Sequence, residues 1–135
     1  MNSKKLLLFV CVENSCRSQI AEAFARIHGG VDVEAYSAGS RPSGAVNPKA
    51  IETMREIGYD LSSHVSKSLD DIPNLTFDLV ATMGCGDECP FVRAKHRDDW
   101  QIPDPKEMPP DEFRKVRNEI ERKVKAVLLF ENARW

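Results

Sequence analysis

The chain has 135 residues, of which 41% are hydrophobic and 30% charged, and its formal net charge is −2. This length and composition predict one globular domain, residues 1–135, whose core needs no disulfide or metal. The small net charge argues against a nucleic-acid partner, and the longest apolar run, Leu6 to Val12, is too short to cross a membrane.

This first apolar run predicts a strand rather than an export signal. Two lysines precede it, as in a signal peptide, but Glu13, Asn14 and Arg17 follow at once without a small-residue cleavage pattern. We therefore expect a cytoplasmic protein, in which the four cysteines begin reduced and serve catalysis, redox chemistry or metal binding.

Strand and helix patterns alternate along the chain. Apolar runs predict strands, apolar residues three or four apart predict helices, and clusters of Gly, Pro and Ser predict loops. In the first half these patterns place a strand at Lys4–Val10, a helix at Ser18–His28, a strand at Val31–Ser37, a loop at Ala38–Ala45, and a helix from Asn47-Pro48 to Gly58. In the second half they place a short helix at Ser66–Ile72, a strand at Phe77–Met83, a loop from Gly84 to about Trp100, a short edge strand at Gln101-Ile102, and a long helix capped by Asp111.

This alternation predicts an open parallel α/β sheet with helices on both faces. Ligands of such sheets bind outside the carboxyl ends of the strands. The segments that follow Val10, Met83 and Ile102 should therefore meet at one edge of the sheet.

The first of these segments carries the residues of an anion site. Cys11 ends the apolar run, and Arg17 comes after five intervening residues, directly before the first helix. A loop between a buried strand and a helix N-terminus presents several backbone N–H groups to one point, which favours a tetrahedral oxyanion. The same positive field favours the thiolate of Cys11, which is a nucleophile. The expected oxyanion-binding residues are Val12, Glu13, Asn14, Ser15, Cys16, Arg17 and Ser18.

The segment from Cys11 to Glu22, CVENSCRSQIAE, resembles the phosphate loop and first helix of the low-molecular-weight protein tyrosine phosphatase superfamily, and its arsenate reductase branch in particular. The resemblance continues in order through Ser37-Ala38-Gly39, Asn47-Pro48, Leu61-Ser62-Ser63-His64, a cysteine after the third strand, and Asp104-Pro105. It implies a four-stranded parallel sheet flanked by helices.

Asp104 is the expected general acid. When Cys11 attacks arsenate or phosphate, water or an alcohol leaves from the opposite side, and the leaving oxygen needs a proton. Pro105 favours an extended backbone at Asp104, and the ordered set of motifs supports the acid role. Arg17 is expected to hold two oxygens of the anion in a fork, while backbone N–H groups of residues 12–17 take the others.

Two further cysteines distinguish a reductase from a phosphatase. A reductase needs a second thiol to attack Cys11 and transfer two electrons to arsenic. We assign this attack to Cys85 and the next one, on Cys85, to Cys89, so that the product is a Cys85–Cys89 disulfide. A zinc site built from these two cysteines and His96 would lack a fourth ligand, so none is predicted.

The expected reductant is thioredoxin. Cys85 and Cys89 lie closer together than the cysteines of the thioredoxin-coupled reductases that the chain resembles. Glutaredoxin with glutathione, or another small thiol, is therefore the alternative reductant.

The predicted function is reduction of arsenate to arsenite by a monomer without metal or cofactor, with phosphate or sulfate as substrate analogues. One alternative is a low-molecular-weight phosphatase acting on phosphotyrosine or small phosphomonoesters, and another is a non-catalytic oxyanion or redox sensor. Phosphatases of the superfamily place aromatic residues after the Asp-Pro pair. Here Lys106-Glu107-Met108 follows instead, which favours a small inorganic substrate.

Two further expectations concern a potassium site and the thiol of Cys16. Some reductases of this kind bind potassium at positions matching Asn14, Glu22 and Ser37, with help from a carboxylate. Lys67 occupies the position expected for that carboxylate, so we predict no potassium site. Cys16, inside the phosphate loop, is expected to be a non-essential thiol.

Overall fold

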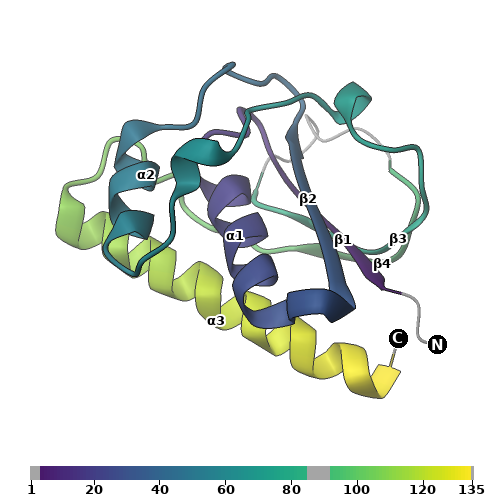
Figure 1. Cartoon of the computed structure of the whole chain (residues 1–135). Coiled ribbons are helices and arrows are strands. Elements are labelled where there is room, and N and C mark those ends of the chain that lie inside the picture. The colour runs from purple at the N-terminus through teal and green to yellow at the C-terminus, as the bar shows by residue number, and fades with distance from the viewer. Residues whose placement is uncertain (1–3, 85–91, 135) are drawn as a thin grey trace.

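The computed structural model of the protein describes residues 4–84 and 92–134, with side chains described up to residue 129. The strands form one all-parallel sheet in the order β2-β1-β3-β4 (Figure 1). Their bounds are β1 Lys5–Cys11, β2 Val33–Gly39, β3 Phe77–Thr82 and β4 Ala94–Asp99. The predicted open, four-stranded parallel sheet is confirmed.

Strand β1 occupies the middle of the sheet, and its side chains alternate between two core clusters. Leu7 and Phe9 belong to the larger cluster, whereas Leu8 and Val10 belong to the smaller one on the opposite face. All four side chains are buried. The continuous apolar run of the sequence is therefore a strand covered on both faces.

The larger cluster is covered by the three α-helices, which lie on the same side of the sheet in Figure 1. Their bounds are α1 Arg17–Gly29, α2 Pro48–Arg55 and α3 Pro110–Arg134. The apolar stripe predicted for the last helix packs into the core through Phe113, Val116, Ile120 and Val124. Asn47 caps α2 by accepting a hydrogen bond from the Lys49 N–H, as its sequence predicts.

The smaller cluster is covered by a lighter layer. Leu69 and Ile72 pack on it from the 3-10 turn η3, Leu69–Asp71, and the residue after it. Both faces of the sheet are thus flanked by helical segments, although the helix predicted over Ser66–Ile72 is reduced to this single turn. Its boundaries follow from a capping box at Ser68 and from Pro73, which leave no room for a longer helix.

Strand β4 corrects the sequence interpretation, which placed a loop before Trp100 and an edge strand at Gln101-Ile102. The strand is Ala94–Asp99, and it pairs with β3 from Ala94 opposite Phe77 to Asp99 opposite Thr82. Its sequence, AKHRDD, is mostly polar because most of its side chains are exposed at the sheet edge, and its one apolar residue, Ala94, packs against the smaller cluster. Gln101 adopts a φ of 48°, which does not fit a strand.

The carboxyl ends of β1, β3 and β4 lead into three neighbouring segments at one edge of the sheet. These segments carry the Cys11 loop, Met83 and Asp104, as the topology of the predicted sheet requires. Within the described ranges, no helix has both the length and the apolar character needed to span a bilayer.

Candidate active site

The loop that joins β1 to α1 is held in place through its carbonyl groups. The carbonyls of Val12, Glu13 and Ser15 accept hydrogen bonds at 2.8, 3.0 and 2.9 Å from backbone N–H groups of the segment after β2, those of Arg41, Ser43 and Asn47. In a trans peptide the N–H points away from the carbonyl, so this arrangement turns the N–H groups of Glu13 and Cys16 to the other side. Both residues line a pocket there.

Gly39 makes this close contact between the loop and β2 possible. A Cβ atom at residue 39 would lie 2.5 Å from the Val12 oxygen and 3.0 Å from the Cys11 oxygen. Only glycine lets the two backbones approach this closely. The Ser37-Ala38-Gly39 motif of the sequence thus serves the shape of the loop.

Asn14 is turned away from the pocket and supports the loop from behind. Its φ is 51°, a left-handed conformation that asparagine tolerates better than most residues, and its side chain is fully buried. The Asn14 Oδ1 accepts hydrogen bonds from the Lys67 N–H at 2.9 Å and from Gln19 Nε2 at 2.8 Å. Its Nδ2 donates to Ser18 Oγ at 2.7 Å.

Ser18 connects this support to the predicted nucleophile, Cys11. Its Oγ lies 2.9 Å from Cys11 Sγ. Because Ser18 Oγ already accepts a hydrogen bond from Asn14, its own proton is available for the sulfur. A hydroxyl that donates to a sulfur stabilises the thiolate relative to the thiol.

The same hydrogen-bonded chain extends away from the pocket to two residues that the sequence analysis did not assign to the site. Gln19 Oε1 lies 3.0 Å from His64 Nδ1, and His64 Nε2 lies 2.6 Å from the Tyr59 hydroxyl. Burial lowers the pKa of His64, which favours the neutral imidazole. Since Gln19 Oε1 only accepts, the neutral ring carries its proton on Nδ1 and accepts at Nε2 from Tyr59.

Arg17 ties the loop to the ends of the other strands. Its NH1 donates to the carbonyls of Met83 at 2.5 Å and Ile102 at 2.8 Å. Its NH2 lies 4.0 Å from Asp104 Oδ2. The Nε of Arg17 is buried and has no hydrogen-bond partner among the described residues, so it is a donor available to a ligand.

These groups enclose a pocket of about 160 Å³ beside the sulfur of Cys11. It is lined by Cys11, Val12, Glu13, Ser15, Cys16, Arg17, Asp104 and Lys106. The predicted nucleophile, arginine and acid thus converge from the first loop and the segment after β4. Asn14 and Ser18 support the pocket from outside this lining. Lys106 is a lining residue to which the sequence analysis assigned no role.

Two of the four cysteines, Cys11 and Cys16, lie within the described residues. Cys11 and Cys16 are buried free thiols. Burial raises the pKa of Cys16 to about 12, which keeps it protonated and unreactive at neutral pH. Cys85 and Cys89, predicted to relay the disulfide, lie outside the described residues.

Glu22 is a buried carboxylate behind the loop, at the position where the resemblance raised the question of potassium. Arg26 NH2 lies 2.6 Å from Glu22 Oε2, Lys67 Nζ lies 3.7 Å from Oε1, and Ser37 Oγ donates to Oε1 at 2.5 Å. Two cationic side chains already balance this carboxylate. The surroundings of Glu22 therefore do not favour a further cation such as potassium.

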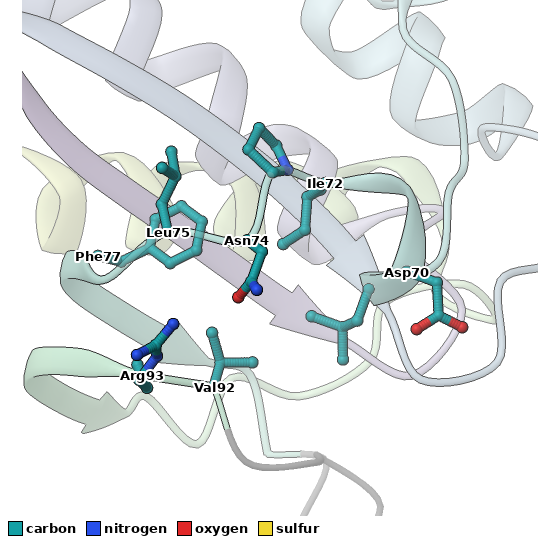
Figure 2. Close-up of a pocket in the computed structure, with 9 residues that line it drawn as sticks. Asp70, Ile72, Asn74, Leu75, Phe77, Val92 and Arg93 are labelled. Atoms are coloured by element: carbon teal, nitrogen blue, oxygen red, sulfur yellow. The ribbon is translucent and has the colours of Figure 1, made fainter.

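A second, larger cavity of about 580 Å³ lies beside the smaller core cluster, on the face of the sheet away from the three α-helices (Figure 2). Figure 2 shows Asp70 at one end of it and Phe77 and Arg93 at the other. Most of its other lining residues are apolar, and none of the nine carries a thiol. The cavity therefore offers no counterpart of the Cys11 chemistry.

The fold and the pocket define a class of protein: a parallel α/β domain whose phosphate-type loop presents a thiol and an arginine to a small anion. Residues 6–133 match the family described as low molecular weight phosphotyrosine protein phosphatase, and the chain belongs to this family.

Several proteins to which the chain is similar are arsenate reductases. The chain is 41% identical to arsenate reductase 2 of Staphylococcus saprophyticus over 126 residues, which cover 90% of this chain and 95% of that protein. A solved arsenate reductase in its phosphate-binding state superposes with a TM-score of 0.85 at 35% identity, covering 93% of this chain and 97% of that one. The thioredoxin-dependent arsenate reductase of Corynebacterium glutamicum gives a TM-score of 0.74 at 33% identity, covering 93% of this chain and 61% of that one.

Proposed function

We propose that this protein is an arsenate reductase that converts arsenate to arsenite with electrons from thiols. The observation that carries the proposal is the pocket in which Cys11, Arg17 and Asp104 converge on a volume suited to a small oxyanion. The arsenate reductases to which the chain is similar over most of its length support the choice of substrate.

In the first step the oxyanion binds against the loop N–H groups and the Arg17 guanidinium. Cys11 attacks arsenic, so that an S–As bond forms while an As–O bond breaks on the opposite side. Asp104 gives its proton to the departing oxygen, which leaves as water. Ser18 stabilises the attacking thiolate through the 2.9 Å contact with Cys11 Sγ.

The second step separates reduction from phosphate-ester hydrolysis. Cys85 attacks the sulfur of Cys11, an S–S bond forms, and the electron pair of the S–As bond stays on arsenic, which leaves as arsenite. Cys89 then attacks Cys85 and releases Cys11 as a thiolate, leaving a Cys85–Cys89 disulfide. We assign the reduction of this disulfide to thioredoxin, in keeping with the thioredoxin-dependent relative, and keep glutaredoxin with glutathione as the alternative.

The relay is tested by comparing wild type with Cys85→Ser. The assay is arsenate-dependent NADPH oxidation, run in parallel with thioredoxin and with glutaredoxin systems. We expect turnover with thioredoxin in the wild type and loss of turnover in Cys85→Ser, because the second thiol is missing. Unaltered turnover in Cys85→Ser would contradict the relay.

A matched measurement shows that the substituted protein still binds its substrate. Inorganic phosphate should protect Cys11 from iodoacetamide equally well in the wild type and in Cys85→Ser. Mass spectrometry after one arsenate turnover should find a Cys85–Cys89 disulfide. A Cys11–glutathione adduct instead would point to the glutaredoxin alternative, and a phosphomonoesterase without arsenate turnover would point to a phosphatase.

A further inference from the structure

Lys106 belongs to the open side of the Cys11 pocket. The Lys106 side chain is 40% exposed and that of its ion-pair partner, Glu13, is 43% exposed. The Arg17 side chain is only 12% exposed. All three line the same cavity with Cys11, which is buried. The pocket therefore has a deep end at the thiol and an open end at Lys106.

The backbone around Lys106 is fixed, although its ammonium is not. Lys49 Nζ donates to the carbonyl oxygens of Lys106 at 3.0 Å and Met108 at 3.4 Å. The Lys106 N–H donates to Asp104 Oδ1 at 3.2 Å. Among the described residues, the ammonium has a single polar contact, 3.4 Å to Glu13 Oε2, and exposed ion pairs of this kind are weak. An incoming anion competes readily for this ammonium.

In-line attack fixes which oxygen of the substrate meets Lys106. Cys11 attacks from the deep end, so the leaving oxygen points to the open end, where Asp104 and Lys106 lie on one segment. In arsenate or phosphate this oxygen carries only a proton or a charge. In a monoester it carries the organic group, which would displace the ammonium.

We propose that Lys106 is a specificity-determining residue, whose ammonium leaves Glu13 and binds the outward oxygen of an unsubstituted inorganic oxyanion. This inference rests on the proposed function and names what selects the substrate class. Glu13 opposes binding twice, because its carboxylate repels the anion and retains the ammonium in the empty pocket. Asp104 remains the proton donor, and Lys106 contributes charge and a hydrogen bond.

The test measures binding to the full-length protein without requiring reduction. Inorganic phosphate and phenyl phosphate are each titrated for protection of Cys11 against iodoacetamide, with the modified residue identified by peptide sequencing in the mass spectrometer. The variants are Lys106→Met, Glu13→Gln and their combination. Lys125→Met, which removes a charge from α3 beyond the pocket, is the matched control.

Lys106→Met should weaken phosphate binding about three- to tenfold, as expected for a partly exposed charged hydrogen bond, and phenyl phosphate binding less than about twofold. Glu13→Gln should strengthen phosphate binding. The double variant should bind phosphate more weakly than Glu13→Gln alone, because the direct contact is lost. Lys125→Met should match the wild type.

Three outcomes would overturn the inference. Equal phosphate affinity in Glu13→Gln and in the double variant would mean that Lys106 only neutralises Glu13. An unchanged affinity in Lys106→Met would remove any role in binding, and an equal loss for both ligands would remove the role in specificity. Absence of phosphate protection in the wild type would instead overturn the oxyanion site itself, and with it the proposed function.

Discussion

At the residue scale, five hydrogen bonds run in one direction from Tyr59 to the sulfur of Cys11. The donors in order are the Tyr59 hydroxyl, His64 Nδ1, Gln19 Nε2, Asn14 Nδ2 and the Ser18 hydroxyl. Each side chain after Tyr59 is polarised by the hydrogen bond that it accepts, which strengthens the chain as a whole. The final bond extends this polarisation to the sulfur of Cys11.

Ser18→Ala tests the last link of this chain. A hydrogen bond to a charged group contributes about 1.5–3 kcal/mol, so its loss should slow the alkylation of Cys11 at neutral pH by about tenfold or more. The measurement is the rate of iodoacetamide reaction at Cys11 at a single pH. Ser62→Ala is the control, since Ser62 donates to Asp60 instead, and its rate should match the wild type.

His64 gives the protein a pH dependence of its own. Burial lowers its pKa below the ordinary value of 6.5, so the unfolded chain binds the proton more readily than the folded protein. The free energy of unfolding should therefore fall as pH drops through 6.5 towards the lowered pKa, and rise again with pH.

Urea unfolding at several pH values checks this dependence. His64→Gln should show a shallower loss of stability than the wild type as pH falls below 6.5. Between pH about 7.5 and 8.5 the histidine is neutral in both states, and the two proteins should then show parallel profiles. Parallel profiles at acidic pH as well would contradict the assignment.

At the scale of elements, the shape of the loop between β1 and α1 depends on its contact with the end of β2. The contact is made by backbone, with Gly39 facing the Val12 and Cys11 carbonyls and Arg41 donating to Val12. The loop shape therefore depends on a glycine on another strand. The Ser40 side chain beside Gly39 adds no such bond, because its hydroxyl has no hydrogen-bond partner among the described residues.

Gly39→Ala should disturb both stability and binding, because its Cβ would lie 2.5 Å from the Val12 oxygen. We expect a loss of about 1–3 kcal/mol in the free energy of unfolding, as for overpacked sites, together with weaker phosphate protection of Cys11. Ser40→Ala removes no hydrogen bond to a described residue and should stay within about 0.5 kcal/mol of the wild type. Urea unfolding of the two variants decides the comparison.

At the scale of the whole molecule, we expect a bound anion and the sheet to stabilise each other through Arg17. This side chain joins α1 to the carbonyls that follow β3 and β4, and its Nε has no hydrogen-bond partner in the described part of the chain. A ligand that binds only the folded protein stabilises it by mass action. Oxyanion binding should therefore be visible in global unfolding.

Phosphate at about 100 times its Kd should raise the free energy of unfolding by about 2.7 kcal/mol. Arg17→Lys keeps the charge but loses the fork of donors, so it should lose most of this increase at the same phosphate concentration. Thermal unfolding with and without phosphate measures the effect. The same shift in wild type and Arg17→Lys would show that Arg17 does not bind the anion.

The sequence by itself determined the core of this protein and singled out the groups that we propose to react. The run at β1 is apolar throughout because the strand is covered on both faces, and the stripe of α3 repeats because one side of the helix is buried. The motif from Cys11 to Arg17 is contiguous, so its chemistry can be inferred from the sequence without knowledge of the fold. Asp104 was recognisable only through its place in an ordered set of motifs.

The tertiary structure decided what depends on backbone pairing and on approach between distant segments. Strand β4 is polar because it is an edge, and only its hydrogen bonds to β3 reveal it. The hydrogen bonds from Tyr59 and His64 towards the loop join residues far apart in the chain, and no periodicity marks them. The position of Lys106 also became visible only in the fold. In the sequence this residue simply follows Asp104-Pro105, whereas the folded segment places it at the open end of the Cys11 pocket.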